Sequence, residues 1–317
     1  MKLRVSSIEF EPAYLNLFRT GELEERVRIA YERLDHCDLC ARYCGVNRRA
    51  TIKGAVCRTG EQALVSSYHA HFGEEAPLVG NGGSGTIFFA WCNLRCQFCQ
   101  NYEISQLGEG IAVEPEEIAA MMLRLQANGC HNINLVSPSH VVAQILAATL
   151  IAAQAGLRLP LVYNTGGYDS PEALALLDGV IDIYMPDIKY ADAIIARRYS
   201  TVHDYPTISR AAVKEMHRQV GDLELDHRGI AIRGLLVRHL VLPGDLAGTR
   251  EILNFLAHEI STNTYINVMD QYYPCFKASE HPELNCRITS EEFDRVIGWA
   301  KEFSLNRLDK RISFRRA

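Results

Sequence analysis

Several features that mark membrane proteins, secreted proteins or nucleic-acid-binding proteins are missing from this sequence. The longest apolar stretch, residues 141–155, contains Gln144 and Gln154 and is too short to span a bilayer. The segment Met1–Phe10 lacks the apolar region of a signal peptide. The formal charge of −5 argues against general nucleic-acid binding, which relies on basic patches. We therefore expect a cytoplasmic protein that does not bind membranes and has no general nucleic-acid binding, and we interpret the basic residues near 310–316 as a solvated tail.

Disulfide bonds are not expected either, because the cytosol keeps thiols reduced. The ten cysteines are unevenly spread, and clustered cysteines in this compartment favour metal binding. Residues 1–85 hold one cluster in loop-like sequence and end in the glycine-rich turn Gly80–Gly85. From Thr86 onward, predicted strands and helices alternate. We therefore predict an N-terminal extension over 1–85 and an α/β domain over 86–317.

Six short β-prone runs, each followed by a helical pattern, define this domain. The predicted strands are residues 86–91, 132–136, 161–163, 180–185, 234–242 and 264–269. Pro115, Pro171 and the capping box Thr289–Glu292 mark the start of helices. Repeated strand–helix units imply parallel strands with right-handed crossovers, although six units fall short of the eight in a full barrel. Periodicity alone allows either a partial (β/α)6 barrel or a doubly wound sheet.

Cys92, Cys96 and Cys99 follow the first predicted strand with the spacing C-x3-C-x2-C. Three thiolates are one short of a closed metal site, so one coordination position stays open for chemistry. The alternative is an adventitious cluster or a zinc site. Zinc would need a fourth ligand, and no nearby residue supplies one by spacing.

A second cysteine set precedes the glycine-rich turn with the spacing C-x2-C-x3-C-x12-C. Its members are Cys37, Cys40, Cys44 and Cys57. Four thiolates form a complete ligand set that suits zinc and iron–sulfur clusters equally. Such a closed site would be structural or would relay electrons. Cys130, Cys275 and Cys286 have no companions at metal spacing, and we interpret them as packing residues.

The three-cysteine spacing, with Phe98 before the last cysteine, resembles that of the radical S-adenosylmethionine (SAM) superfamily. The resemblance implies that Cys92, Cys96 and Cys99 bind a [4Fe–4S] cluster whose fourth iron is chelated by SAM. It also favours a partial (β/α)6 TIM-like barrel with the cluster loop after its first strand. In the superfamily the residue at the place of Phe98 lies against adenine, although simple packing also suits it.

Further SAM contacts are expected at the other strand ends, where parallel barrels carry their functional groups. After the second strand, many members have a glycine-glycine-glutamate turn that binds the SAM amine, whereas this chain has Ser137-Pro-Ser-His140. Ser137 can accept a hydrogen bond from the amine. His140 suits a contact or an ordinary helix start equally. Thr165, in a glycine-containing turn after the third strand, is either a SAM contact or part of a plain turn.

The last three strand ends carry charged or polar candidates. Asp187 and Lys189 point to the same side beyond the fourth strand, where they suit the ribose and carboxylate of SAM, or form a surface ion pair. Arg238 lies within the apolar fifth strand and needs a carboxylate partner. His239 points the opposite way and is expected to pack. Gln271 follows the sixth strand as a candidate SAM or substrate contact.

Longer strings are similar to the PflX-type radical SAM proteins, homologues of the pyruvate formate-lyase activating enzyme. They are His71–Leu78, Gly83–Phe89, Cys92–Ser105, Tyr163–Asp169, Asp182–Tyr190 and Val237–Gly244. The resemblance covers nearly the whole chain. It implies an oxidoreductase that takes a hydrogen from a glycine Cα of a partner protein and receives electrons from a donor such as flavodoxin or ferredoxin. No side chain need act as a general acid or base.

Three hypotheses about function follow from the sequence. The first is a radical SAM enzyme that acts on a protein, such as a glycyl-radical-enzyme activase. The second is a radical SAM enzyme that modifies a small molecule or peptide. The third is a non-catalytic metal-binding module.

Overall fold

The computed structural model describes residues 10–309 of the chain. Residues 1–9 and 310–317 lie outside the described part. The predictions for the segment Met1–Phe10 and for a solvated C-terminal tail therefore fall on residues that are wholly or mostly outside it. Within residues 10–309, no helix has both the length and the apolar character needed to cross a bilayer.

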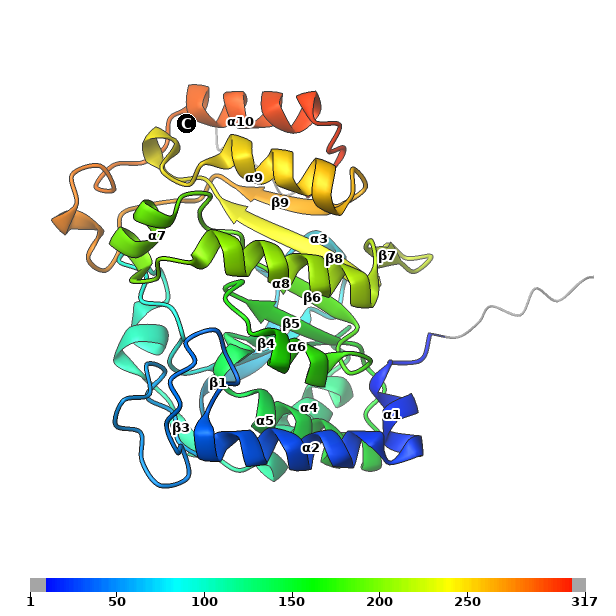
Figure 1. The fold of residues 1–317 in the computed structure, drawn as a ribbon. Helices are drawn as coiled ribbons and strands as arrows, with labels where there is room; N and C mark the ends of the chain where they lie inside the picture. Colours follow the sequence, from blue (N-terminus) through cyan, green and yellow to red (C-terminus); the bar gives the residue numbers. More distant parts are fainter. Residues whose placement is uncertain (1–9, 310–317) are drawn as a thin grey trace, which may run out of the picture.

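Six parallel strands, adjacent in the order in which they occur along the chain, form the centre of the molecule (Figure 1). They are β2 (Ser84–Phe89), β4 (Ile133–Val136), β5 (Leu161–Thr165), β6 (Ile183–Pro186), β8 (Ala231–Leu240) and β9 (Tyr265–Met269). This confirms the six predicted strands and their parallel direction. The sheet does not close on itself among the described residues. It continues as antiparallel β1 (Ala63–His71) and β3 (Ile111–Val113) at one edge and as parallel β10 (Arg307–Leu308) at the other, while β7 (Glu224–Leu225) pairs with β8.

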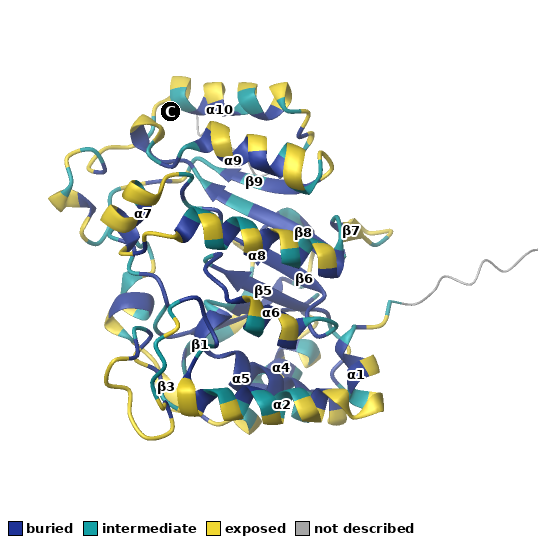
Figure 2. Ribbon diagram, in the orientation of Figure 1, coloured by how far each residue is buried: buried dark blue, intermediate teal, exposed yellow. Residues whose placement is uncertain are grey.

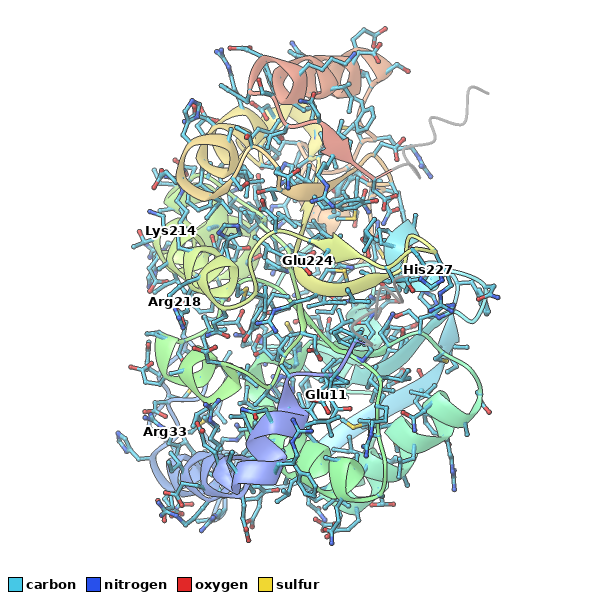
Figure 3. The ribbon with its side chains drawn as sticks, turned by 90° about the vertical axis from the view of Figure 1, so that its right-hand side faces the viewer. Glu11, Arg33, Lys214, Arg218, Glu224 and His227 are labelled. Carbon is cyan, nitrogen blue, oxygen red and sulfur yellow. The ribbon has the colours of Figure 1, made fainter. Side chains whose placement is uncertain are left out.

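Helices cover the outer face of this sheet. They are α4 (Pro115–Ala127), α5 (Val142–Gln154), α6 (Pro171–Leu177), α7 (Ala193–Ser200), α8 (Tyr205–Val220), α9 (Thr249–Phe255) and α10 (Ser290–Glu302). Ser170 caps α6, and Thr289 and Glu292 form the predicted capping box of α10. Figure 3 shows Lys214 and Arg218 on the solvent side of α8, where they pair with Glu259 and Asp178.

Irregular turns complete the connections between these elements. The 3-10 turns are Arg33–His36, Pro138–His140, Pro243–Asp245 and Ala278–Glu280, and π-turns occur at Glu103–Leu107 and Leu256–Ile260.

The two faces of the sheet have separate cores because side chains alternate along each strand. Tyr184, Leu235 and Val237 belong to the large outer core beneath the helices. Ile183, Met185 and Leu236 face the inside, where they pack with Leu78 of the short helix α3 (Ala76–Val79). Figure 1 shows α3 on the opposite side of the sheet from α8. The segment before β2 therefore fills the concave interior.

The N-terminal region is more regular than its sequence suggests. It forms α1 (Tyr14–Thr20) and α2 (Glu22–Glu32), and α2 packs on α5. This cover explains the long apolar run of 141–155, because α5 is buried on nearly all sides (Figure 2). The four early cysteines lie in the coil between α2 and β1. Because β1 pairs with β2, the predicted boundary at residue 85 falls within one continuous sheet.

A buried carboxylate ties the N-terminal helices to this sheet. Asp182 accepts hydrogen bonds from the backbone N–H of Ala13 (2.8 Å) and of Leu161 (3.1 Å), one on each oxygen. Burial raises the pKa of Asp182 to about 7. Since this value exceeds that of an unfolded aspartate, the contribution of Asp182 to stability falls as the pH rises through the interval up to 7.

We expect Asp182→Asn to lower the free energy of unfolding by about 1–3 kcal/mol at pH 5, because the new amide N–H₂ would face a backbone N–H. The deficit should shrink at pH 8, where the wild-type protein bears the cost of a buried charge. Urea unfolding of both proteins at the two pH values measures this. Asp178→Asn, at an exposed ion pair, is the control. A deficit that grows with pH would contradict the assignment.

Candidate active site

A cavity of about 210 Å³ lies where the strands end, beside the cysteine loop. Cys96, Cys99 and Phe98 line one side, and residues of the loops after β6 and β9 line the other. The cavity brings together five of the eight predicted SAM contacts: Phe98, Asp187, Lys189, Arg238 and Gln271. The loops concerned all reach the left-hand side of Figure 1.

Each sulfur of the cysteine loop has a polar neighbour that suits a thiolate ligand. Ser200 Oγ donates to Cys96 Sγ at 3.0 Å, Ser105 Oγ lies 3.0 Å from Cys99 Sγ, and the Leu94 N–H points to Cys92 Sγ at 3.4 Å. Burial raises the pKa of Cys92 to about 12. Burial also raises the pKa of Cys99, so these two thiols ionise when a metal supplies positive charge.

Three thiolates are the donor set of a four-iron cluster with one open iron. Among residues 10–309, no three Cys, His, Asp or Glu side chains converge closely enough to hold a single metal ion. The irons of a four-iron cluster each take their own thiolate, so the ligands need not meet at one point. The donor set, one ligand short of four, leaves one iron open.

Opposite the sulfurs, Asp187 joins two cations. Its oxygens lie 2.6 Å from Lys189 Nζ and 2.8 Å from Arg238 Nε. Burial opposes ionisation of Asp187, but Arg238 and Lys189 outweigh it and lower the pKa of this carboxyl. The prediction of a carboxylate partner for Arg238 is confirmed. Arg238 also donates to Asn164 Oδ1 at 2.7 Å, which links three neighbouring strands.

Two buried acids that the sequence analysis missed lie on the inner side of Arg238. Glu74 and Glu75 precede α3, with oxygens 3.8 and 4.0 Å from the guanidinium. Burial, reinforced by Glu75, raises the pKa of Glu74 to about 7. Glu75 Oε1 accepts a hydrogen bond from Asn267, whereas Glu75 Oε2 has no partner among the described residues. The two acids therefore add negative charge to the buried surroundings of Arg238.

The glycine turn after β5 presses against the cysteine loop. A Cβ on Gly167, whose φ is +75°, would lie 2.3 Å from the Asp187 carbonyl oxygen, and one on Gly166 would lie 2.8 Å from Leu94. This confirms that these glycines permit close backbone approach. Tyr205 of α8, also missed from the sequence, fixes the same region. Its hydroxyl accepts from the Lys189 N–H at 2.9 Å and lies within hydrogen-bond distance of the Gly166 carbonyl.

The other three predicted SAM contacts are not part of the cavity wall. Ser137 is half-buried in the left-handed conformation at the end of β4. Thr165 donates to Asp169 at 2.7 Å inside a buried network. His140 Nε2 lies 3.0 Å from the Ala90 carbonyl, and burial lowers the pKa of this imidazole to about 3. His140 is therefore a neutral donor that holds the end of β2.

Three further predicted residues differ in their environments. Phe98 and Gln271 lie at the cavity, whereas His239 is buried away from it. Phe98 lines the cavity and also packs edge-on against Tyr190 and Tyr272. Gln271 is exposed at the cavity rim, where its carbonyl accepts from Gln100. His239 is buried as expected, between the Ile188 carbonyl and the Thr249 hydroxyl.

We expect Arg238→Leu to destabilise the protein by about 3–5 kcal/mol at pH 8, because Glu74 and Glu75 would lose their cation and Asp187 would keep only Lys189. The loss should be smaller at pH 5, where Glu74, with its pKa raised to about 7, is protonated. Denaturant titrations at both pH values test this, with Arg250→Leu at an exposed pair as the control. An equal loss at both pH values would show that lost packing, not charge, causes the effect.

Comparisons with known proteins identify the family of this chain. A family model described as the Radical SAM superfamily matches residues 86–256. An uncharacterized protein from Methanocaldococcus jannaschii is 32% identical over 300 residues, which cover 92% of this chain and 82% of that protein.

Two solved structures are more distant. Streptococcus suis SuiB bound to S-adenosylmethionine has 12% identity and a TM-score of 0.47, over 69% of this chain and 47% of its own. A radical SAM methyltransferase from Sphaerobacter thermophilus has 12% identity and a TM-score of 0.45, over 69% of this chain and 64% of its own. This chain thus spans less than two thirds of either. On the family match and the sequence relative, the chain belongs to the radical SAM superfamily.

Proposed function

We propose that this protein is a PflX-type radical SAM enzyme that activates a glycyl-radical enzyme in the cytoplasm. The observation that carries the radical SAM part is the cavity in which Cys96 and Cys99 face Asp187, Lys189 and Arg238. The activase part is supported by the sequence strings around the cysteine loop and the strand ends. An exposed aromatic, Tyr273, lies in the loop that follows β9 and suits contact with a protein substrate.

Cys92, Cys96 and Cys99 would hold the [4Fe–4S] cluster, and the cavity beside them would hold SAM. When bound, these groups supply one-electron cleavage of SAM to an adenosyl radical that abstracts hydrogen. Lys189 would pair with the SAM carboxylate while keeping Asp187, because an ammonium has three donors. Phe98 would pack on adenine, and Gln271 would close the rim.

The remaining residues position these contacts. Arg238 fixes Asp187, and the tight turn at Gly166 and Gly167 holds the cysteine loop against the end of β6. Ser137, Thr165 and His140 would position the backbone between the strand ends and the cysteine loop. Ser137 and Thr165 also remain candidates for SAM contacts. The proposal also includes a flavodoxin or ferredoxin as the electron donor, and a metal at the four N-terminal cysteines.

Anaerobic reconstitution with iron and sulfide, followed by dithionite and SAM, should yield 5′-deoxyadenosine. Chromatographic quantification should find none with Cys96→Ala, while Cys286→Ala, an exposed cysteine outside both sets, should match the wild type. If the wild-type protein forms no 5′-deoxyadenosine, it is a non-catalytic metal-binding module and the proposal fails.

Lys189→Met should reduce 5′-deoxyadenosine formation at low SAM concentration by about tenfold or more, because one charge-assisted hydrogen bond to the ligand is lost. Lys214→Met, on the outer face of α8, is the matched control. Initial rates across a range of SAM concentrations separate weaker binding from slower chemistry. Unchanged kinetics in Lys189→Met would place the SAM carboxylate elsewhere.

The activase assignment is tested with the glycyl-radical enzymes encoded in the same genome. Co-incubation with SAM and reductant should produce the EPR doublet of a glycine-centred radical on one of them. If 5′-deoxyadenosine forms but none of these proteins acquires the doublet, the enzyme acts on a small molecule or peptide instead.

A further inference from the structure

We propose that Cys37, Cys40, Cys44 and Cys57 hold an iron–sulfur cluster that takes electrons at the protein surface and passes them to the cluster at Cys92, Cys96 and Cys99. The sequence alone left zinc and iron–sulfur equally open for this set. The relay rests on the proposed function, whereas the identity of the second centre does not.

The four cysteines lie in one coil segment that backbone hydrogen bonds fold back on itself. The Cys37 N–H donates to the Val46 carbonyl and the Gly45 N–H to the Cys37 carbonyl, both at 3.0 Å. Cys37, Cys40 and Cys57 are more than nine-tenths buried, and Cys44 is partly buried.

A buried arginine closes this loop around the sulfurs. The Arg48 guanidinium lies 3.6 Å from Cys37 Sγ and also donates to the carbonyls of Thr59 and Gly60, just beyond Cys57. It thereby holds the fourth cysteine beside the first three. A buried cation in contact with sulfur suits a ligand set that carries net negative charge once metallated.

Two further arginines join this loop to the radical SAM cysteine loop, one from each side. Arg42, between Cys40 and Cys44, donates to the Asn93 carbonyl at 2.7 Å, next to Cys92. Arg95, next to Cys96, donates to the Val56 carbonyl, next to Cys57. The two cysteine loops are therefore joined by reciprocal hydrogen bonds from an arginine side chain of one loop to a backbone carbonyl of the other.

Trp91 lies between the two sets as well. It directly precedes Cys92, and the Arg58 guanidinium, directly after Cys57, lies 5.0 Å from its ring centroid. Arg95 lies 5.8 Å from the same ring. Trp91 (φ +67°) and Arg58 (φ +49°) both have left-handed backbones, which cost energy and persist where the surroundings hold them. A zinc site that only stabilised the four-cysteine loop would not require these contacts with the loop of Cys92, Cys96 and Cys99.

The outer surface of the four-cysteine loop suits an acidic electron donor. Residues 39–60 contain no carboxylate, and four of their cations, Arg42, Arg49, Lys53 and Arg58, are at least partly exposed. Arg49 is also paired with Asp35 and Glu61, which flank this segment. Tyr43 and Ile52 are about half exposed there, at 47% and 52%. Figure 2 shows this loop as one of the most exposed segments of the described chain. An acidic one-electron carrier would meet both complementary charge and apolar contact.

The electron balance of the relay is simple. A reduced flavodoxin or ferredoxin gives one electron to the four-cysteine centre and becomes oxidised by one electron. That centre gives the electron to the three-cysteine cluster and returns to its oxidised state. The electron then breaks the carbon–sulfur bond of SAM, as in the proposed function.

The identity of the centre is tested without any activity. A Cys92→Ala/Cys96→Ala/Cys99→Ala variant keeps only the four-cysteine set. After anaerobic reconstitution it should retain about four irons and four sulfides per chain and show an EPR signal on reduction. Adding Cys40→Ala and Cys57→Ala should remove both, whereas adding Cys130→Ala should not. About one zinc without sulfide, or no metal at all, would overturn the proposal.

The relay is tested on the unmodified protein with both centres reduced. Their EPR signals should broaden each other by magnetic coupling, and the broadening should vanish in the triple variant. In addition, Cys40→Ala/Cys57→Ala should lose 5′-deoxyadenosine formation driven by reduced flavodoxin but keep that driven by dithionite. Unbroadened signals, or full flavodoxin-driven activity in this variant, would contradict the relay while leaving the radical SAM function intact.

Discussion

The site depends on one buried cation. Arg238 binds Asp187 from the next strand and Asn164 from the strand beyond, and it lies near Glu74 and Glu75 from the segment inside the barrel. Transfer of this guanidinium out of water costs desolvation free energy. Ion pairing with the surrounding acids offsets this cost only if they are held close to Arg238. The same geometry that satisfies Arg238 therefore fixes the end of β6, where Lys189 projects towards the sulfurs.

Much of this fold follows from local sequence signals. Apolar, β-prone runs identified all six parallel strands, and Pro171 and the capping residue Thr289 marked helix starts. The need to pair a charge inside an apolar strand correctly predicted a carboxylate beside Arg238. Sequence spacing could not say which acids, because the partners at positions 74, 75 and 187 meet Arg238 only in the tertiary fold.

The site residues that the sequence analysis missed have no local sequence pattern that marks them. Glu74 and Glu75 lie outside any periodic pattern, in a segment whose sequence resembles a surface loop. Tyr205 begins α8 and reaches the glycine turn through tertiary packing alone. The string His71–Leu78, noticed only as a resemblance, was the available signal for the two acids. Conversely, His140 and Thr165 stand at predicted strand ends, but their side chains form hydrogen bonds in buried networks. The sequence places a residue at a strand end without saying whether its side chain faces the cavity or the protein interior.

The placement of α3 has a consequence for how the polypeptide can be divided. Leu78, Glu74 and Glu75 form the floor of the concave interior, and β1 covers the outer edge of β2, yet all precede residue 86. A fragment that began at residue 86 would expose the hydrogen-bonding edge of β2 and leave the interior unfilled. Exposed strand edges template association between chains. Residues 63–85 are thus an integral part of the sheet and of its inner core.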